Sequence, residues 1–192
     1  DDAYGFLPAE APTPFAALLP DLTWHIGGLS KCLGAGLRLA YVVAPDNKAA
    51  WPYASAMRAN TVMASPLNMA LATRWIEDGT ADGILRFIRT EAAARQEMVA
   101  DILPAGSYRA DPISFNIWLP LGGGWTRAIF SSHMRDAGIG VVASDAFTVE
   151  GTAPEAVRVC LGGPIGRDAL KGALNFMAHA LQGPPEMAAS FF

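Results

Sequence analysis

Residues 27–38 read Gly27-Gly28-Leu29-Ser30-Lys31-Cys32-Leu33-Gly34-Ala35-Gly36-Leu37-Arg38, which places one lysine and one arginine among four glycines. Apolar runs flank this stretch at residues 22–26 and 37–43, so we expect two strands joined by a glycine-rich turn. Glycine lets the backbone approach a ligand closely. The Lys31 amine can form a Schiff base with a carbonyl group, and the Arg38 guanidinium can bind phosphate oxygens. The turn therefore suits a ligand with a carbonyl group and a phosphate, while its spacing alone also fits a solvated hairpin.

The composition indicates a globular chain with a sizeable core. The 192 residues are 52% hydrophobic and 17% charged. The net charge is −4 and no basic run occurs, so this segment lacks the charge pattern of a nucleic-acid surface. Cys32 and Cys160 form no disulfide or metal pattern, and no signal peptide or membrane-length apolar run is visible, so we expect a cytoplasmic protein. The chain opens at Asp1 without a methionine, and we expect further residues before it.

Hydrophobic periodicity and turn residues predict the secondary structure. The predicted strands are 23–26, 37–43, 114–119, 141–143 and 157–161, and the predicted helices are 46–59, 66–77, 81–103, 125–137 and 168–181. The run at 37–43 is continuously apolar, as in a strand covered on both faces. Pro52 predicts a bend or break in its helix. The order after residue 104 predicts a small α+β layer, reached through the long helix that Thr80 caps.

The lysine turn resembles a known motif. Ser30-Lys31, followed by Gly36-Leu37-Arg38 and Ala40-Tyr41-Val42, is similar to the lysine motif of fold type I pyridoxal-phosphate (PLP) enzymes. Its form is closest to the aminotransferase-like domain of MocR-type GntR transcriptional regulators. The resemblance covers about residues 1–182 and implies an α/β fold of which this chain holds a part. Residues 1–78 would be the end of the large PLP-binding domain, 79–183 the small C-terminal α+β domain, and 184–192 a frayed tail.

The resemblance assigns cofactor contacts to the residues around the turn. Lys31 would bind the cofactor aldehyde and Arg38 its phosphate. Asp1 and Tyr4 have the Asp-x-x-Tyr spacing that precedes the lysine in this family. Asp1, rather than its neighbour Asp2, would pair with the ring nitrogen, which acts as an electron sink only while protonated. Tyr4 would hydrogen-bond the ring hydroxyl. Without the lysine motif, the same two residues would be a loop acid and a packed tyrosine.

The turn departs from the family pattern at two positions. Gly28 stands where a serine usually bonds the phosphate, and Ala35 stands where a proline is common. Both changes are expected to weaken cofactor binding without abolishing it. Ser30 is a candidate substitute donor, although on an extended backbone its side chain would point away from that of Lys31.

Two further residues are candidates for ligand binding. Alternation over 157–161 puts Arg158 on the strand face opposite its apolar neighbours. By resemblance, Arg158 would bind the carboxylate of an amino acid, and Asn116 would approach the substrate from a neighbouring strand. The alternative for Arg158 is an edge-strand arginine in a surface ion pair.

The resemblance implies a PLP-binding effector domain of a MocR-type regulator. That domain would sense a small amine or amino acid through Schiff-base chemistry on Lys31, with turnover slow or absent. DNA would be bound only by an N-terminal domain outside this sequence, the intact protein would be a homodimer, and this chain alone would bind PLP weakly. A free-standing aminotransferase uses the same residues, and a truncated domain that acts only in dimerisation is a third reading. A basic winged-helix segment upstream of Asp1 would separate the first from the second.

Overall fold

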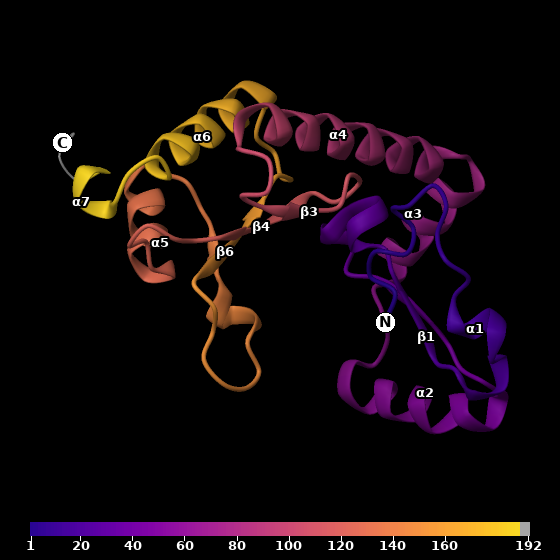
Figure 1. The fold of residues 1–192 in the computed structure, drawn as a ribbon. Helices are drawn as coiled ribbons and strands as arrows, with labels where there is room; N and C mark the ends of the chain where they lie inside the picture. The colour runs from indigo at the N-terminus through magenta and orange to yellow at the C-terminus, as the bar shows by residue number, and fades with distance from the viewer. Residues whose placement is uncertain (189–192) are drawn as a thin grey trace. The chain divides into compact units, whose positions relative to one another are not determined.

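The computed structural model describes residues 1–188, which form two compact units (Figure 1). Unit 1 spans Asp1–Thr90 and unit 2 begins at Glu91, so the division falls inside the helix α4 (Thr80–Ile102). The predicted domain boundary between residues 78 and 79 concerns the domains of the whole protein and stays a prediction. Within the described residues, no helix combines the length and the apolar character needed to cross a membrane.

Unit 1 is built around a two-stranded antiparallel sheet. Its elements are α1 (Phe15–Leu18), the 3-10 turn η1 (Pro20–Leu22), β1 (His25–Gly28), the turns η2 (Ser30–Gly34) and η3 (Ala35–Leu37), β2 (Ala40–Val43), α2 (Asn47–Thr61), α3 (Pro66–Glu77) and the start of α4. β1 and β2 pair from His25↔Val43 to Gly28↔Ala40. The expected hairpin is therefore present, but β1 begins at His25 instead of residue 23 and β2 begins at Ala40 instead of residue 37.

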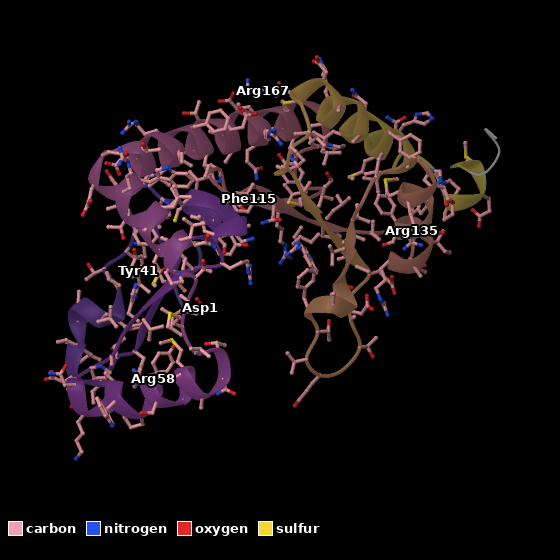
Figure 2. All side chains as sticks on the ribbon, turned by 180° about the vertical axis from the view of Figure 1, so that it is seen from behind. Asp1, Tyr41, Arg58, Phe115, Arg135 and Arg167 are labelled. Atoms are coloured by element: carbon pink, nitrogen blue, oxygen red, sulfur yellow. The ribbon has the colours of Figure 1, made fainter. Side chains whose placement is uncertain are left out.

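The prediction that residues 37–43 form one strand covered on both faces is wrong for this chain. Leu37 belongs to η3, and β2 begins only at Ala40. Tyr41 and Val43 are 50% and 56% exposed, because β1 is the only strand that pairs with β2 within the described residues (Figure 2). The apolar run is correctly identified as a strand, but its burial would need neighbours beyond those in unit 1.

Helices α2 and α3 begin at the residues that capping rules predict. The Asp46 carboxylate accepts from Ala49 N at 2.6 Å, and the Ser65 hydroxyl accepts from Asn68 N at 3.4 Å. α2 continues through Pro52, so the predicted break is absent. The helix ends instead at Val62, whose φ of 63° and ψ of −64° form a γ-turn closed by Met63 N donating to Thr61 O at 2.7 Å.

The start of α4 differs from the prediction in its cap. Thr80 is the first helical residue, and its N–H donates to the Asp78 carboxylate at 3.0 Å. Hydrogen bonding to Thr80 lowers the pKa of Asp78. The cap is therefore the aspartate that precedes Gly79, and Thr80 itself does not cap the helix.

Unit 2 is a four-stranded antiparallel sheet with helices packed on one face. Its elements after α4 are β3 (Arg109–Ala110), β4 (Asn116–Pro120), α5 (Arg127–Asp136), β5 (Val142–Ala143), the 3-10 turn η4 (Ser144–Phe147), β6 (Ala156–Cys160), α6 (Arg167–Ala180) and α7 (Pro185–Ala188). The strand order is β3-β4-β6-β5. The small α+β layer is confirmed, with β3 and η4 as elements that the sequence did not predict.

The core of unit 2 lies between the sheet and three helices. Alternate residues of β4 and β6 point into it, and α4, α5 and α6 supply the facing side chains. The fully buried members include Val99, Ile117, Leu119, Phe130, Met134, Val157, Leu161, Leu174 and Met177. The other face of the sheet is left free of helices and carries the candidate ligand residues.

Two further predictions differ from the structure. The helical spacing of Ile84, Phe87 and Val99 predicts one apolar face on α4 with arginines and glutamates opposite, but Phe87 is 66% exposed and Arg95 is buried. At the C-terminus, Pro185–Ala188 forms α7 where the sequence predicts a frayed tail, and residues 189–192 lie outside the described residues.

Candidate functional site

The turn that carries Lys31 is helical. Residues Ser30–Gly34 form a single π-helical turn in which the N–H groups of Leu33 and Gly34 both donate to Leu29 O at 3.0 Å. Such turns are rare and often occur at functional sites. In a helical turn, neighbouring side chains do not point to opposite sides as they do in a strand. The reason for expecting Ser30 to point away from Lys31 is therefore wrong, and both side chains are half-buried.

Buried side chains on both sides of Lys31 anchor the turn. Cys32 and Leu33 pack with Leu29, Leu37 and Ala72 in the core of unit 1. The Asn68 amide of α3 donates to Leu37 O at 3.0 Å. Burial raises the pKa of the Cys32 thiol, so it stays protonated and donates weakly to backbone oxygens. The neighbours of Lys31 are thus fixed in the core, and its amine is the candidate reactive group of the turn.

Tyr4 is the candidate residue that unit 1 brings close to Lys31. The Lys31 Nζ lies 6.0 Å from the centroid of the Tyr4 ring, at the outer limit of a cation–π contact. The two residues are far apart in the sequence, and the fold places the amine beside the phenol. This is the pairing that the Asp-x-x-Tyr spacing and the lysine motif predict together.

The two N-terminal aspartates have different surroundings. Asp2 N donates to Ile26 O at 2.8 Å, and the Asp2 carboxylate lies 3.9 Å from His25 Nε2. A Cβ at Gly5 would collide with the Asp2 carboxylate, so this glycine leaves room for the Asp2 side chain. Asp1 is exposed, and it lines a hollow of about 690 Å³ together with Asp2 and Tyr4. Asp2 is therefore occupied by local contacts, while Asp1 (labelled in Figure 2) faces open space.

Arg38 closes the turn in an unusual backbone conformation. Its φ of 52° and ψ of 43° lie in the left-handed region, which L-residues other than glycine rarely adopt. Its N–H donates to Ala35 O at 3.4 Å, and its side chain is exposed. The lining of the hollow that holds Asp1 and Tyr4 includes neither Lys31 nor Arg38.

Arg158 lies on a central strand of unit 2. β6 pairs with β4 on one side and β5 on the other, so Arg158 stands opposite Trp118 and Val142. Val157, Val159 and Leu161 are buried on the other face, as the alternation predicts. The edge-strand alternative is wrong, and no ion pair to Arg158 is found within the described residues.

An aromatic side chain lies against the Arg158 guanidinium. Its Cζ lies 4.8 Å from the centroid of the Phe147 ring, and Phe147 meets Trp118 edge to face at 5.9 Å. The Arg158 Nε is buried and has no hydrogen-bond partner within the described residues. A buried cationic donor without a partner is costly unless an anion binds it, so this atom indicates an anionic ligand.

Asn116 shares a sheet face with Arg158. It lies two residues from Trp118 on β4, and its register partner on β6 is Cys160. Strand periodicity therefore puts the side chains of Asn116, Trp118, Arg158 and Cys160 on the face without helices. The contribution of Trp118 can be inferred from this periodicity. That of Phe147 cannot, because it comes from the unpredicted turn η4.

Comparison with known proteins links the chain to one curated relative. No protein-family model matches the sequence. The uncharacterized HTH-type transcriptional regulator YdeF of Bacillus subtilis (strain 168) is 29% identical over 183 residues. The match covers 94% of this chain and 39% of YdeF.

Solved structures with a similar fold are aminotransferases. The kynurenine aminotransferase of Pyrococcus horikoshii has a TM-score of 0.80 at 17% identity, covering 94% of this chain and 46% of that one. LysN, the alpha-aminoadipate aminotransferase of Thermus thermophilus, has a TM-score of 0.80 at 21% identity. The match covers 95% of this chain and 49% of LysN.

The chain thus spans about two fifths of the curated relative and about half of the aminotransferases. It has part of the fold of the PLP-dependent aminotransferases of fold type I, and its similarity to an HTH-type regulator agrees with the resemblance of its lysine turn to the aminotransferase-like domain of MocR-type regulators.

Proposed function

We propose that this chain is the effector-binding part of a transcriptional regulator, where it binds PLP through Lys31 and senses a small amine or amino acid. The observation that carries the proposal is the anchored turn with its half-buried lysine beside Tyr4, in a fold shared with PLP-dependent enzymes. The similarity to an HTH-type regulator favours sensing over metabolism. Binding of the effector would shift a conformational equilibrium of the intact homodimer, which would contact DNA through another domain.

The donor set of unit 1 suits the cofactor. When bound, PLP supplies an aldehyde that condenses reversibly with amines. The Lys31 amine would hold this aldehyde, and the Tyr4 hydroxyl would donate to the ring hydroxyl. The Asp1 carboxylate would keep the ring nitrogen protonated. The Arg38 guanidinium would bind the phosphate, with the Ser30 hydroxyl in place of the serine that Gly28 replaces.

The free face of the unit 2 sheet suits the carboxylate of an amino acid. Arg158 offers a buried, unpartnered Nε. The Phe147 ring lies against the guanidinium and Trp118 packs against Phe147, so one side of the cation is covered by apolar surface, which strengthens its attraction for an anion. Asn116 adds a neutral donor and acceptor on the same face. An effector with a carboxylate would therefore be preferred over the amine that lacks it.

A free-standing aminotransferase is the second candidate. The solved structures of similar fold support it, since they are described as aminotransferases. In that case the Lys31 amine would also move a proton at the substrate α-carbon. Production of an α-keto acid from an amino acid by the full-length protein would favour this candidate, and specific DNA binding would favour the regulator.

Labelling of the lysine tests the proposal. The full-length protein is incubated with PLP, reduced with borohydride and digested, and the pyridoxyl group is located by mass spectrometry. We expect the label on Lys31 and its loss in Lys31→Ala. The other two lysines of this chain, Lys48 and Lys171, provide matched controls, because Lys48→Ala and Lys171→Ala should retain the label. A label that persists at full stoichiometry in Lys31→Ala would contradict the proposal.

A further inference from the structure

Two arginines of α4 hold the segments that carry the candidate site residues, one in each unit. We propose that Arg89 and Arg95 are positioning residues. Arg89 holds in place the N-terminal segment that carries Asp1 and Tyr4, and Arg95 holds in place the strand pair that carries Asn116 and Arg158. The inference rests on the proposed function, because it concerns how the proposed ligand-binding residues of each unit are held in place within that unit.

Arg89 binds the backbone just beyond the Asp-x-x-Tyr spacing. Its Nε donates to Leu7 O at 2.8 Å, and its Nη2 donates to Phe6 O at 2.7 Å and Pro8 O at 2.9 Å. Leu7 is buried, and its N–H donates to Tyr4 O at 3.0 Å. The segment has no helix or strand of its own before α1, so these bonds replace the missing regular structure. The Arg89 guanidinium therefore fixes residues 6–8, which directly follow the segment that carries Asp1 and Tyr4.

Arg95 binds the backbone just beyond the strand that carries Arg158. Its Nη2 donates to Ile165 O at 2.9 Å, and its Nη1 donates to Leu161 O. Its Nε lies 3.0 Å from Glu91 Oε1, and this carboxylate neutralises the buried charge. The residue is only 7% exposed. Arg95 is therefore a buried link between α4 and the loop that follows β6.

The loop that Arg95 spans has little other support. It consists of Gly162, Gly163 and Pro164, in which Gly163 adopts a φ of 108° and Pro164 has no N–H to donate. The bonds from Arg95 lie on both sides of this loop. Gln96 adds bonds to the partner strand, since its Nε2 donates to Ser114 O at 2.5 Å and to Asn116 O at 3.3 Å. α4 thus fixes the ends of both strands whose free faces carry the candidate ligand residues.

The division of the chain between Thr90 and Glu91 separates the two arginines. Arg89 contacts only unit 1 and Arg95 contacts only unit 2 in the bonds described. Their substitution should therefore affect different binding steps. Loss of Arg89 should weaken binding of the cofactor, and loss of Arg95 should weaken binding of the ligand carboxylate.

The test measures both steps on the full-length protein. PLP affinity is obtained from absorbance titration, and ligand affinity from the spectral change of the bound cofactor with L-alanine or with ethylamine, which lacks the carboxylate. We expect Arg89→Ala to lower PLP affinity about tenfold. We expect Arg95→Lys to lower L-alanine affinity about tenfold and to leave PLP and ethylamine affinity unchanged. Arg86→Ala is the matched control, since Arg86 is exposed on the same helix.

The outcomes separate this inference from the proposed function. Suppose that Lys31 is labelled, but Arg89→Ala leaves PLP affinity unchanged and Arg95→Lys leaves L-alanine affinity unchanged. The inference is then wrong and the proposed function stands, and the same holds if both variants lower the same affinity equally. A wild-type protein that binds L-alanine no better than ethylamine overturns the proposed role of Arg95 in carboxylate binding. If Lys31 is not labelled, the proposed function fails first. Should Arg95→Lys not fold, Gln96→Ala makes the same test, because it removes the neighbouring bonds to β4.

Discussion

At the scale of single residues, one carboxylate of unit 2 pairs with two guanidinium groups. The Glu91 carboxylate accepts a hydrogen bond from Arg95 Nε at 3.0 Å and one from Arg167 Nη2 at 2.9 Å, so it pairs with two guanidinium groups. The hydrogen bond from Arg167 and then that from Arg95 lower the pKa of Glu91 from 4.5 to about 2. Arg167, labelled in Figure 2, begins α6, so the carboxylate also joins α4 to α6. Arg158 has no carboxylate partner within the described residues, and its buried Nε has no hydrogen-bond partner there, as expected of the carboxylate-binding group that we propose.

The Glu91→Gln variant should lose stability in a pH-dependent way. The folded-state pKa of Glu91 is depressed, so its contribution is fully present above about pH 4.5 and is lost as the pH falls toward about 2. The difference in free energy of unfolding between wild type and Glu91→Gln should therefore be largest near neutral pH and should shrink across that window. Urea denaturation at a series of pH values measures it. Glu77→Gln, at an exposed position on α3, should show no such difference.

A pH-independent difference would show that Glu91 acts through its shape and not through its charge. The side chain of Glu91 is 22% exposed and that of Arg167 is 52% exposed, so added salt should reduce the effect only in part.

At the scale of elements, the end of α2 holds strain that a substitution can release. Val62 has a positive φ in a γ-turn, which is unfavourable for a β-branched side chain. Val62→Gly should stabilise the chain by about 1 kcal/mol, because relief of strain exceeds the entropy that glycine adds to the unfolded state. Urea denaturation checks the sign. Val149→Gly is the control: Val149 is 96% exposed without a positive φ, and its replacement should not stabilise.

Local sequence rules predict most helices and strands of this chain. They fail where contacts between distant residues determine the backbone conformation or the burial of a side chain. The starts of α2 and α3 and the alternation around Arg158 are confirmed, because each depends on neighbouring residues alone. The sequence predicts an extended backbone at the lysine turn, which is helical because packing of Cys32 and Leu33 draws it into the core. The sequence also predicts a solvated face at Arg95, which is buried because its partners are distant backbone carbonyls.

At the scale of the whole molecule, the two units differ in how well they bury apolar side chains. The core of unit 2 is formed by residues at most 5% exposed from a sheet and three helices. The core of unit 1 is five residues around the lysine turn, and α2 buries none of its residues. Most of the large exposed hydrophobic side chains of the described chain lie in unit 1, among them Phe15, Leu22, Trp51 and Leu67. The apolar faces of unit 1 are therefore available for contacts beyond this chain.

Hydrogen exchange should reveal this asymmetry. For the 192-residue chain, we expect the amides of β4 and β6 to exchange about a hundredfold or more slowly than those of β1 and β2. Both pairs are antiparallel and hydrogen-bonded, so the difference reports on burial and not on pairing. Mass spectrometry of peptides covering the four strands measures the rates. Equal protection would mean that unit 1 is as stable as unit 2 despite its exposed faces.

The candidate site shows the same limit of prediction from sequence. The motif predicts which residues take part, and the fold brings Tyr4 beside Lys31 and puts Asn116 on the face of Arg158. The aromatic enclosure of Arg158 by Phe147 and the anchoring by α4 depend on contacts across the fold and leave no local pattern.

The left-handed backbone at Arg38 carries an evolutionary consequence. Glycine would relieve a conformational cost of about 1 kcal/mol at this position, so drift should favour it wherever the guanidinium is dispensable. An arginine here can therefore serve as a marker in genome surveys. Homologues that keep it would be those still selected to hold a phosphorylated cofactor, and homologues with glycine would be candidates for regulators that have become insensitive to the vitamin from which that cofactor is made.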